Sequence, residues 1–414
     1  MNKLFFDPIH KYIELDAELL EIIDTTEFQR LRNIKQLGIA YYVFIGASHN
    51  RFEHSIGVSY LSGLLIKNIK DKQPELNITE RDIILIKIAG LCHDLGHACF
   101  SHFFDNLFLK SKLSINDDNI HHEIRSENII KYIIKKYNLN YSVEEIEFIC
   151  ALINSKKKRK FKKPNFMFEI VANNKSGLDC DKIDYLLRDT KSIGLNSSFE
   201  YNRLFNQARV IDDTICYPDK EVFNIYELFH MRFKMHKQIY QHPVINQIEF
   251  MILDLLNLVD EEFEISKNIM NIEKFITYTD NILDRIKYSS SNIQAKELIE
   301  RIENRKLYKF INEIIYDKNN NINNKLIKFN EDITKLGLNN NIITIKFVIN
   351  FNLKKKNPVD EIYFYKISKP DIKFKIKKKM VSLLLPSIFE ENIIRFFIKN
   401  DNVECYNLCM DFII

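Results

Sequence analysis

Apolar residues recur every three to four positions along most of the chain, and this spacing predicts a mainly helical protein. Thr25 or Thr26 lies where it can cap a helix that follows the first periodic stretch. Helical spacing resumes at Lys182 and continues with breaks to about Asp260, and further helices with polar linkers are predicted over 264–315. The clearest helical stretches are residues 14–24, 60–70, 82–92, 126–137 and 143–153, and polar loops are predicted at 110–122 and 155–165.

The pattern changes character in the C-terminal part of the chain. Short segments there are rich in β-branched and aromatic residues, alternate partly between apolar and polar, and are separated by Pro358 and Pro370. We therefore predict a small sheet, then a helix at residues 386–399, with a flexible Asn-rich loop at 319–324 ahead of both. The predicted strands are residues 341–351, 361–367 and 371–376.

These patterns predict a mostly α fold, with a large helical core and a small α+β C-terminal lobe. The chain has 414 residues, of which 46% are hydrophobic, enough to bury a sizeable core. The predicted division is residues 1–260 for the core, 261–335 for a helical extension and 336–414 for the small lobe. No internal repeat is visible.

Composition bears on the compartment more than on the chemistry. No stretch of about 20 apolar residues lacks charges, so no membrane span is expected. The N-terminus is too poor in apolar residues for a secretory signal. Seven cysteines without a CxxC pair favour a reducing, intracellular compartment, cytoplasmic or nuclear. Cys405 and Cys409 can share a helix face, most simply as small buried residues.

The net charge of +4 is only mildly basic, but one segment stands apart. Residues 156–163 read KKKRKFKK. A solvated loop is the simplest interpretation, and a nuclear-import signal or a contact with single-stranded nucleic acid is the alternative.

The most informative chemistry is a set of histidines and aspartates placed among apolar residues. His93 and Asp94 end the apolar run 83–92, His54 lies in RFEHS, and Asp181 lies in DCDKIDY. A buried carboxylate beside an imidazole needs a compensating partner. A divalent ion is the simplest one, because two histidines and two carboxylates can hold it and leave positions open for water. The ligand types leave Fe, Mn, Mg, Zn and Ni open.

Further ionisable residues surround this set in the sequence. His97 comes four residues after His93, His102 follows shortly after, and His122 is next to Glu123, which can orient it. An imidazole suits proton transfer near neutral pH. Fixed cations that could neutralise phosphate charge are Arg51, Lys182 and Arg232, and the last shares a helical face with His236 and Tyr240 at four-residue steps. The remaining histidines, His10, His49, His230 and His242, are expected to be structural or to support the site.

The pattern His…His-Asp…Asp, with the words around it, resembles the HD-domain dNTP triphosphohydrolases, of the vertebrate type that also carries a SAM domain. The resemblance is dense over residues 7–110 and 167–250 and thinner beyond. No SAM domain is expected ahead of the HD-domain catalytic core in this chain. The segments that carry the resemblance are DTTEFQRLR (24–32), IKQLG (34–38), GASHNRFEHS (46–55) and YQH (240–242).

The resemblance implies a metal-dependent reaction that converts dNTP and water to 2′-deoxynucleoside and triphosphate. It implies that His97, His102 and His122 line the phosphates, with His102 placed to protonate the leaving 5′-oxygen. It also implies a sugar pocket in which a tight wall rejects a ribonucleotide by steric clash. In that pocket Gln36 and Asp189 bind the 3′-hydroxyl, Tyr185 and Tyr240 form aromatic walls, and Leu37 lies against the sugar.

The resemblance further implies nucleotide-driven assembly of a homotetramer, with GTP or dGTP as the activator. A second nucleotide site is less well matched, because Phe6, Pro218 and Pro243 stand where the family has an amide and basic residues, and losing two cations weakens polyphosphate binding. We therefore predict retained guanine activation and a weaker second site. Lys3, Asp24, Gln29 and Arg32 match the guanine-nucleotide site, and Arg203, Lys220, His242, Arg305 and Lys309 match the second.

Two other functions remain open at this point. The metal motif alone is compatible with another HD-type phosphohydrolase, acting on a different nucleotide or on nucleic acid. A nucleic-acid-binding protein with little turnover, which uses residues 156–163, is the alternative from a different class.

Overall fold

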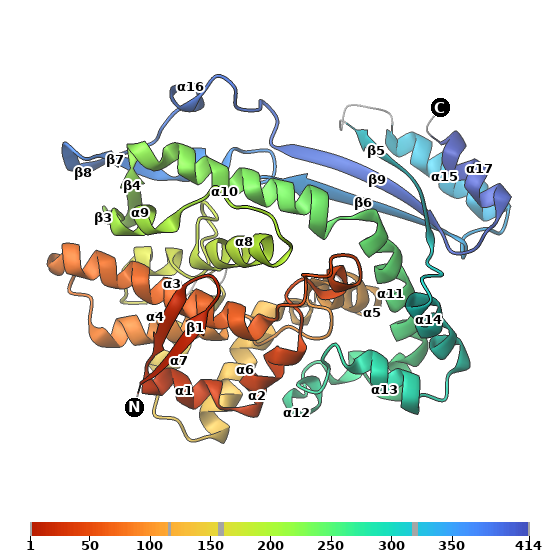
Figure 1. Cartoon of the computed structure of the whole chain (residues 1–414), viewed down its shortest axis with the longest axis horizontal. Coiled ribbons are helices and arrows are strands. Elements are labelled where there is room, and N and C mark those ends of the chain that lie inside the picture. The colour runs from red at the N-terminus through yellow and green to blue at the C-terminus, as the bar shows by residue number, and fades with distance from the viewer. Residues whose placement is uncertain (1, 115–116, 156–160, 317–321, 413–414) are drawn as a thin grey trace. The chain divides into compact units, whose positions relative to one another are not determined.

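The computed structural model (Figure 1) describes residues 2–114, 117–155, 161–316 and 322–412. These residues form two compact units. The lysine-rich residues 156–160 therefore lie outside the described part of the chain. Both units combine segments that are distant in sequence. The first unit comprises residues 1–232, 264–282 and 357–385, and the second comprises 233–263, 283–356 and 386–414. The predicted domain division at 260 and 335 stays a prediction.

The first unit is built around packed helices, as the apolar spacing predicts. Helix α3 packs against α4 and α8, and α4 packs against α7. The helices are α1 (Ala17–Ile23), α2 (Thr26–Gln29), α3 (Arg51–Lys72), α4 (Glu80–Cys92), α5 (Lys110–Lys112), α6 (His122–Lys136), α7 (Val143–Ile153), α8 (Cys180–Ser192), α9 (Tyr201–Asn206), α10 (Val222–Met235, which crosses into the second unit), α12 (Ile272–Phe275) and α16 (Lys378–Val381). Short 3-10 helices are η1 (Arg30–Asn33), η2 (Gly38–Tyr42), η3 (Pro74–Leu76), η5 (Asp118–Ile120), η6 (Asn165–Glu169), η7 (Asp219–Glu221), η9 (Ser266–Asn268) and η10 (Pro358–Glu361), and η4 (Phe104–Leu109) is a π-helix.

Local sequence explains where the main helices begin. Asn50 caps α3 and pairs with Glu53 in a reciprocal capping box, so that two backbone N–H groups at the helix start are satisfied. The same arrangement starts α4 and α7. Thr25 caps α2, which confirms the predicted cap. The helices predicted at 60–70, 82–92, 126–137 and 143–153 are all confirmed.

Two small sheets also belong to the first unit. The N-terminal hairpin pairs β1 (Lys3–Asp7) with β2 (Lys11–Leu15), which the sequence did not predict because its apolar residues Leu4, Phe6 and Tyr12 are exposed. The other sheet has the strand order β3-β4-β7-β8, in which only β4 and β7 run parallel. Its strands are β3 (Arg209–Ile211), β4 (Thr214–Pro218), β7 (Tyr363–Lys366) and β8 (Lys369–Phe374).

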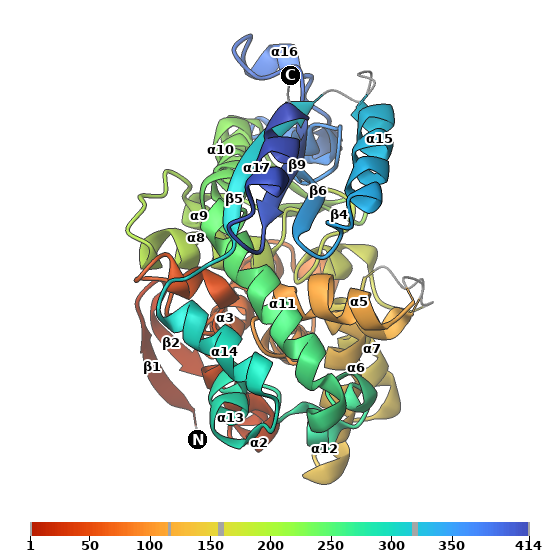
Figure 2. The same cartoon turned by 90° about the vertical axis from the view of Figure 1, so that its right-hand side faces the viewer.

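The second unit combines helices with an antiparallel three-stranded sheet (Figure 2). Helices α15 and α17 bury apolar residues against the sheet, in a cluster that includes Phe329, Phe396 and Phe412. Its elements are the π-helix η8 (His236–Tyr240), α11 (Pro243–Phe263), α13 (Ile282–Ser289), α14 (Ile293–Glu303), β5 (Lys309–Tyr316), α15 (Ile322–Lys335), β6 (Ile342–Asn350), β9 (Glu390–Ile398) and α17 (Val403–Asp411).

The helix predicted at 386–399 is wrong, because residues 390–398 form β9, the central strand between β5 and β6. A central strand that is buried on both faces has no alternation, so its apolar run looks like that of a buried helix. The end of the predicted helical region 264–315 is likewise strand β5. Of the predicted loop 319–324, residues 319–321 lie outside the described residues and 322–324 begin α15.

The mostly α fold with a small α+β part is confirmed, as are the three predicted strands, although β7 and β8 pair with β3 and β4 rather than with β6. All seven cysteines are buried and none forms a disulfide. Among the described residues, no helix is both long and apolar enough to cross a membrane.

Candidate metal centre and histidine cluster

The four predicted metal ligands come together inside the first unit. The donor atoms of His54, His93 and Asp94 lie within 4.8 Å of one another. Asp181 Oδ1 lies 3.1 Å from His54 Nε2 and 3.4 Å from His93 Nε2. Helix α3 supplies the first residue, the end of α4 supplies the His-Asp pair and the first turn of α8 supplies Asp181.

Both imidazoles are held so that Nε2 faces the common point. His54 Nδ1 lies 2.7 Å from Asp184 Oδ2, and His93 Nδ1 lies 2.7 Å from the carbonyl oxygen of Gly90. A hydrogen bond at Nδ1 fixes the tautomer and leaves the Nε2 lone pair for a metal. The chain's own residues therefore fit a divalent cation, with two nitrogen and two oxygen ligands.

Asp184 is the centre of a buried network that sequence reasoning did not assign. Its carboxylate accepts two hydrogen bonds from Arg188 and lies 2.6 Å from His10 Nε2. Arg188 in turn donates to Asp7 Oδ2 at 2.9 Å. The sequence held a signal for this network, because Asp181, Asp184 and Arg188 are spaced by three and four residues, which places them on one helical face.

Close packing of α3 against α8 brings Asp184 to His54. A Cβ atom added at Gly57 would lie only 1.9 Å from Asp184 Oδ1. Only glycine therefore allows the two helices to approach this closely at that point.

Charges in the centre stabilise the carboxylates as anions. Burial alone would raise the pKa of Asp94, but Arg51 above all holds that pKa well below its usual range. Burial opposes a proton on His54, yet its hydrogen bonds to Asp181 and Asp184 outweigh burial and raise the pKa of His54 to about 10. The pKa of Asp181 is lowered, against burial, by the same histidine and His93. A site this rich in negative charge attracts a cation in place of a proton.

A second cluster, of His97, His102, Asp105 and His122, adjoins the first. Their donor atoms also lie within 4.8 Å of one another. The rings of His97 and His122 stack at 3.9 Å, and His102 meets His97 edge-on at 4.9 Å. His97 Nε2 lies 3.4 Å from Asp94 Oδ1, so that contact joins the two clusters.

Asp105 holds the second cluster and was not assigned from the sequence. It lies 3.0 Å from His122 Nδ1 and forms an ion pair with Arg125. Glu123 lies 3.7 Å from the same His122 nitrogen. Burial opposes protonation of His122, but Glu123 and then Asp105 outweigh it and raise the pKa of His122. The sequence suggests that Glu123 orients His122. Asp105 lies closer to His122 Nδ1 and can orient the same ring.

The other two histidines are biased toward the neutral form. Burial, then Arg51 and His122, hold the pKa of His97 well below its usual range. Desolvation by the surrounding protein, followed by the same two cations, lowers the pKa of His102 to about 4, although the residue keeps contact with solvent. Arg51 forms an ion pair with Asp94 and also donates to Ser101 Oγ at 2.8 Å, so it is fixed between the clusters.

The predicted sugar-binding residues of the first unit are linked through His49. The backbone N–H of Gln36 donates to the carbonyl of His49, and His49 Nε2 lies 2.8 Å from Asp189 Oδ1. The side-chain oxygen of Gln36 is buried and has no hydrogen-bond partner among the described residues. Such an acceptor suits a ligand hydroxyl. Leu37 is half-buried in the same segment.

The remaining predicted substrate residues fall at the start of α8, in α10 and in η8. Lys182 is buried, with Nζ 3.5 Å from Asp179 Oδ1, and Tyr185 is half-buried one turn later. Arg232 acts electrostatically on both. His236 and Tyr240 belong to the second unit, where η8 replaces the regular four-residue steps by a π-helical turn, and their rings meet edge-on at 4.9 Å.

Residues predicted to bind the guanine nucleotide lie together on the surface of the first unit. Lys3 Nζ is 3.9 Å from Asp24 Oδ2. Arg32 donates to Gln29 at 2.8 Å and lies over the ring of Phe52 at 3.5 Å. Phe6, on the hairpin with Lys3, is two-thirds exposed.

Residues predicted for the second nucleotide are divided between the units. Arg203 and Lys220 belong to the first unit, where Arg203 pairs with Glu221 at 2.7 Å. His242, Arg305 and Lys309 belong to the second, where Lys309 pairs with Asp401. Pro218 is paired in β4, and Pro243 begins α11.

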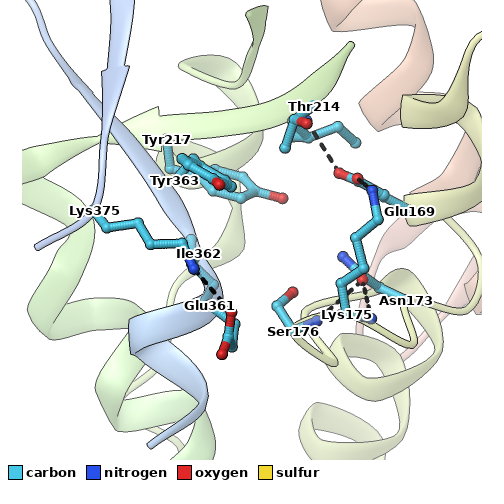
Figure 3. Close-up of a pocket in the computed structure, with 11 residues that line it drawn as sticks. Glu169, Asn173, Lys175, Ser176, Thr214, Tyr217, Glu361, Ile362, Tyr363 and Lys375 are labelled. Carbon is cyan, nitrogen blue, oxygen red and sulfur yellow. Dashed lines mark hydrogen bonds and ion pairs between the residues drawn. The ribbon is translucent and has the colours of Figure 1, made fainter. Parts of the chain in front are cut away.

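A separate cavity of about 300 Å³ lies beside the mixed sheet of the first unit (Figure 3). Glu169 pairs with Lys175 at 2.6 Å, and Glu361 pairs with Lys375 at 2.8 Å across its lining. The paired charges leave no excess of positive charge for a polyphosphate, and none of the predicted site residues lines this cavity.

Comparison with known proteins places both clusters in a matched region. The HD domain model matches residues 51–190, and the HD associated region model matches 199–341. The deoxynucleoside triphosphate triphosphohydrolase SAMHD1 homolog of Dictyostelium discoideum is 41% identical over 405 residues, which cover 96% of this chain and 78% of that protein. The deoxynucleoside triphosphate triphosphohydrolase SAMHD1 of Gallus gallus is 39% identical, over 97% of this chain and 72% of its own. A putative HD domain-containing protein of Acanthamoeba polyphaga mimivirus is 37% identical, over 90% and 87%.

Proposed function

This chain belongs to the HD-domain deoxynucleoside triphosphate triphosphohydrolases, and from that premise we propose that it hydrolyses dNTPs to the 2′-deoxynucleoside and inorganic triphosphate. The observation that carries the proposal is the junction of the two clusters, where Asp94 contacts both His93 and His97. A metal-type ligand set and a proton-transfer set share one buried carboxylate there.

His54, His93, Asp94 and Asp181 would hold the divalent ion, which supplies charge for a phosphoryl oxygen and lowers the pKa of water. Fe, Mn, Mg, Zn and Ni all suit two imidazoles and two carboxylates. Asp184 keeps His54 in the ligating tautomer, since it occupies Nδ1. Arg51 neutralises negative charge between the clusters, where the phosphates would lie.

His102 is the proposed general acid for the leaving 5′-oxygen. Without substrate, desolvation lowers its pKa to about 4, so the bound polyphosphate must supply negative charge that favours the protonated imidazole. His97 and His122 line the phosphates beside it, and Asp105 and Glu123 orient His122. Lys182 and Arg232 contribute positive charge from α8 and α10.

Sugar recognition is proposed for Gln36, Leu37, Tyr185, Asp189 and Tyr240, with His236 beside the last. Support comes from the unpartnered side-chain oxygen of Gln36 and from its link to Asp189 through His49. This pocket should favour a deoxyribose and reject a 2′-hydroxyl by clash.

Regulation is proposed to use the exposed set of Lys3, Asp24, Gln29 and Arg32, which would bind GTP or dGTP. The second set of Arg203, Lys220, His242, Arg305 and Lys309 would bind another nucleotide more weakly, because Pro218 and Pro243 remove cations. A homo-oligomer, from dimer to tetramer, would bring these surfaces together.

Product analysis of dGTP hydrolysis tests the reaction itself. Purified protein with Mn²⁺ or Mg²⁺ is incubated with dGTP and, in parallel, with GTP alone as substrate, and products are resolved by ion-pair chromatography. We expect deoxyguanosine and triphosphate from dGTP and much less guanosine from GTP. Pyrophosphate or monophosphate from dGTP would instead assign another HD-type reaction.

A further inference from the structure

One carboxylate outside the assigned residues joins two separate segments of the site. Asp280 lies in the first unit between α12 and α13. Its Oδ1 accepts the backbone N–H of Phe100 at 2.7 Å, and its Oδ2 accepts the backbone N–H of Lys35 at 2.9 Å. Each of these bonds is charge-assisted and partly shielded from water, which makes it stronger than a neutral hydrogen bond.

The two segments carry different parts of the proposed chemistry. Lys35 directly precedes Gln36 and Leu37, which are assigned to the sugar. Phe100 precedes His102 by two residues. Ser101 adds a further link, because its hydroxyl donates to the carbonyl of Lys35 at 2.7 Å. Asp280 therefore fixes the distance between the sugar-binding segment and the turn that carries the proposed acid.

The turn that carries His102 has a backbone conformation that it would not adopt by itself. Phe100 and Ser101 both have a backbone φ of +59°, in the left-handed region that residues other than Gly, Asn and Asp rarely adopt. A residue in this region is strained, and the surrounding contacts must hold it in place. Gly38 makes room for the turn, since a Cβ there would lie 2.5 Å from the carbonyl oxygen of Phe100.

The same stretch of chain supports the loop before His102 in a second way. The guanidinium groups of Arg30 and Arg125 lie 5.2 and 5.4 Å from the ring centre of Phe275, in α12. Figure 1 shows α12 near α2, the helix that ends just before Arg30. Arg30 donates to the carbonyls of Leu95 and His97 at 2.6 and 2.7 Å. Arg125 donates to the carbonyl of Gly96 between them at 2.9 Å. Two arginines on one ring thus hold three consecutive carbonyls.

We propose that Asp280, with Phe275 in support, positions His102 and the sugar-binding segment relative to each other and so sets both turnover and sugar discrimination. This inference rests on the proposed function, because it uses the roles of His102 and Gln36. It assigns a task to residues of the HD associated region, which lie outside the stretch that holds the metal-type ligands.

Asp280→Asn tests the proposal with the full-length protein. An amide can accept only one of the two N–H groups in this geometry, so the backbone of Lys35 or Phe100 loses its partner. We expect kcat for dGTP to fall about 10²-fold, since a displacement of about 1 Å at reacting groups has that effect. The ratio of dGTP to GTP hydrolysis should fall as well, while metal content stays at the wild-type level.

Asp213→Asn is the matched control, because Asp213 also accepts two backbone N–H groups, those of Asn165 and Phe166. It should leave kcat and the sugar ratio within twofold of wild type. Equal losses in both variants would overturn the proposal in favour of general destabilisation. Phe275→Leu should also lower kcat, by less than Asp280→Asn does. Phe148→Leu, at another buried phenylalanine, is its control.

Backbone hydrogen exchange provides a test that needs no turnover. Peptides that cover residues 34–38 and 98–103 should exchange faster in Asp280→Asn than in Asp213→Asn, and the remainder should be unchanged. If wild type hydrolyses no dNTP, the proposed function fails, but faster exchange confined to these peptides still supports the positioning role. Unchanged exchange or unchanged kcat in Asp280→Asn would overturn the positioning role. Loss of folding in both Asp280→Asn and Phe275→Leu would overturn it as well.

Discussion

The candidate metal centre and the proposed guanine-nucleotide site both belong to the first unit, yet they differ in construction. The side chains of His54 and Asp184 are at most 1% exposed and bonded to each other, whereas those of Lys3 and Asp24 are 59% and 63% exposed. The metal-type ligands have partners that fix their orientation before anything binds. In the exposed set, Lys3 and Asp24 contact each other only at 3.9 Å, and Arg32 donates to Gln29 of the same set.

This difference suggests that one region serves catalysis and the other serves regulation. Buried, fully bonded groups are already placed for chemistry and lose little on binding a substrate. Exposed side chains must be ordered by a ligand, which makes them suited to respond to its concentration. We therefore expect the first region to determine whether turnover is possible and the second to determine how much of it occurs.

Loss of a metal-type ligand should have the largest effect. Asp94→Asn removes a carboxylate from the centre and leaves Arg51 buried without its ion pair. We expect metal content to fall and kcat/KM for dGTP to drop on the order of 10³-fold or more. Metal analysis and turnover, with Asp371→Asn as a surface control, check this. Full activity without the carboxylate would remove Asp94 from the mechanism.

The next effect separates chemistry from metal binding. His102→Ala should lower kcat about 10²- to 10⁴-fold while metal content remains at the wild-type level, because a general acid contributes this much to rate. His121→Ala, an exposed histidine before α6, is the control. Loss of metal together with activity would place His102 among the structural residues instead.

Disruption of the support for His54 should have an intermediate effect. Asp184→Asn weakens the hydrogen bond to His54 Nδ1 and the pair with Arg188, so the metal should bind about 10- to 100-fold more weakly. Titration of metal-free protein with Mn²⁺ measures this affinity. Wild-type affinity in the variant would show that the buried network has no part in metal binding.

Changes in the exposed set should alter activation without altering the reaction. Arg32→Ala removes a cation that donates to Gln29. We expect the GTP concentration for half-maximal dATP hydrolysis to rise about tenfold, because the bound nucleotide would lose one charge-assisted hydrogen bond. Products and metal content should be unchanged, and Lys67→Ala is the control. A loss of turnover at saturating GTP would contradict the division of roles.

The smallest effect concerns stability rather than turnover. Burial raises the pKa of Glu249, on α11, to about 7, against the opposing influence of Asn246 and Arg395. The folded protein holds the proton on Glu249 up to a higher pH than the unfolded chain does. The neutral carboxyl group therefore contributes fully to the free energy of unfolding below about pH 4.5, and this contribution is lost as pH rises through about 7. Glu249→Gln should therefore stabilise the protein by about 1–3 kcal/mol at pH 8 and by little at pH 5.

Urea unfolding of Glu249→Gln at both pH values checks this prediction. Glu261→Gln, at an exposed position on the same helix, is the control and should change neither. A stabilisation that is equal at pH 5 and pH 8 would show that the carboxyl group does not titrate as described.

The residues found from sequence are those whose chemistry is locally out of place. His93 and Asp94 stand out because they end an apolar helix, and α4 itself follows from its spacing and capping box. Asp184 is not out of place in this way, and its only signal in the sequence is its helical spacing to Asp181. Asp280 gave no local signal, because its contact to Phe100 spans 180 residues. The apolar run of β9 predicts a helix for a related reason, since only the two neighbouring strands, which are distant in sequence, identify it as a strand.

Hydrolysis of dATP with and without GTP tests both proposed sites at once, because dATP reports on the hydrolytic site and GTP on the exposed one. Products are quantified by ion-pair chromatography in the presence of Mn²⁺ or Mg²⁺. We expect deoxyadenosine and triphosphate in a 1:1 ratio, as the reaction stoichiometry requires, with turnover that depends on GTP. Pyrophosphate or monophosphate as product, or the same rate without GTP, would contradict this expectation.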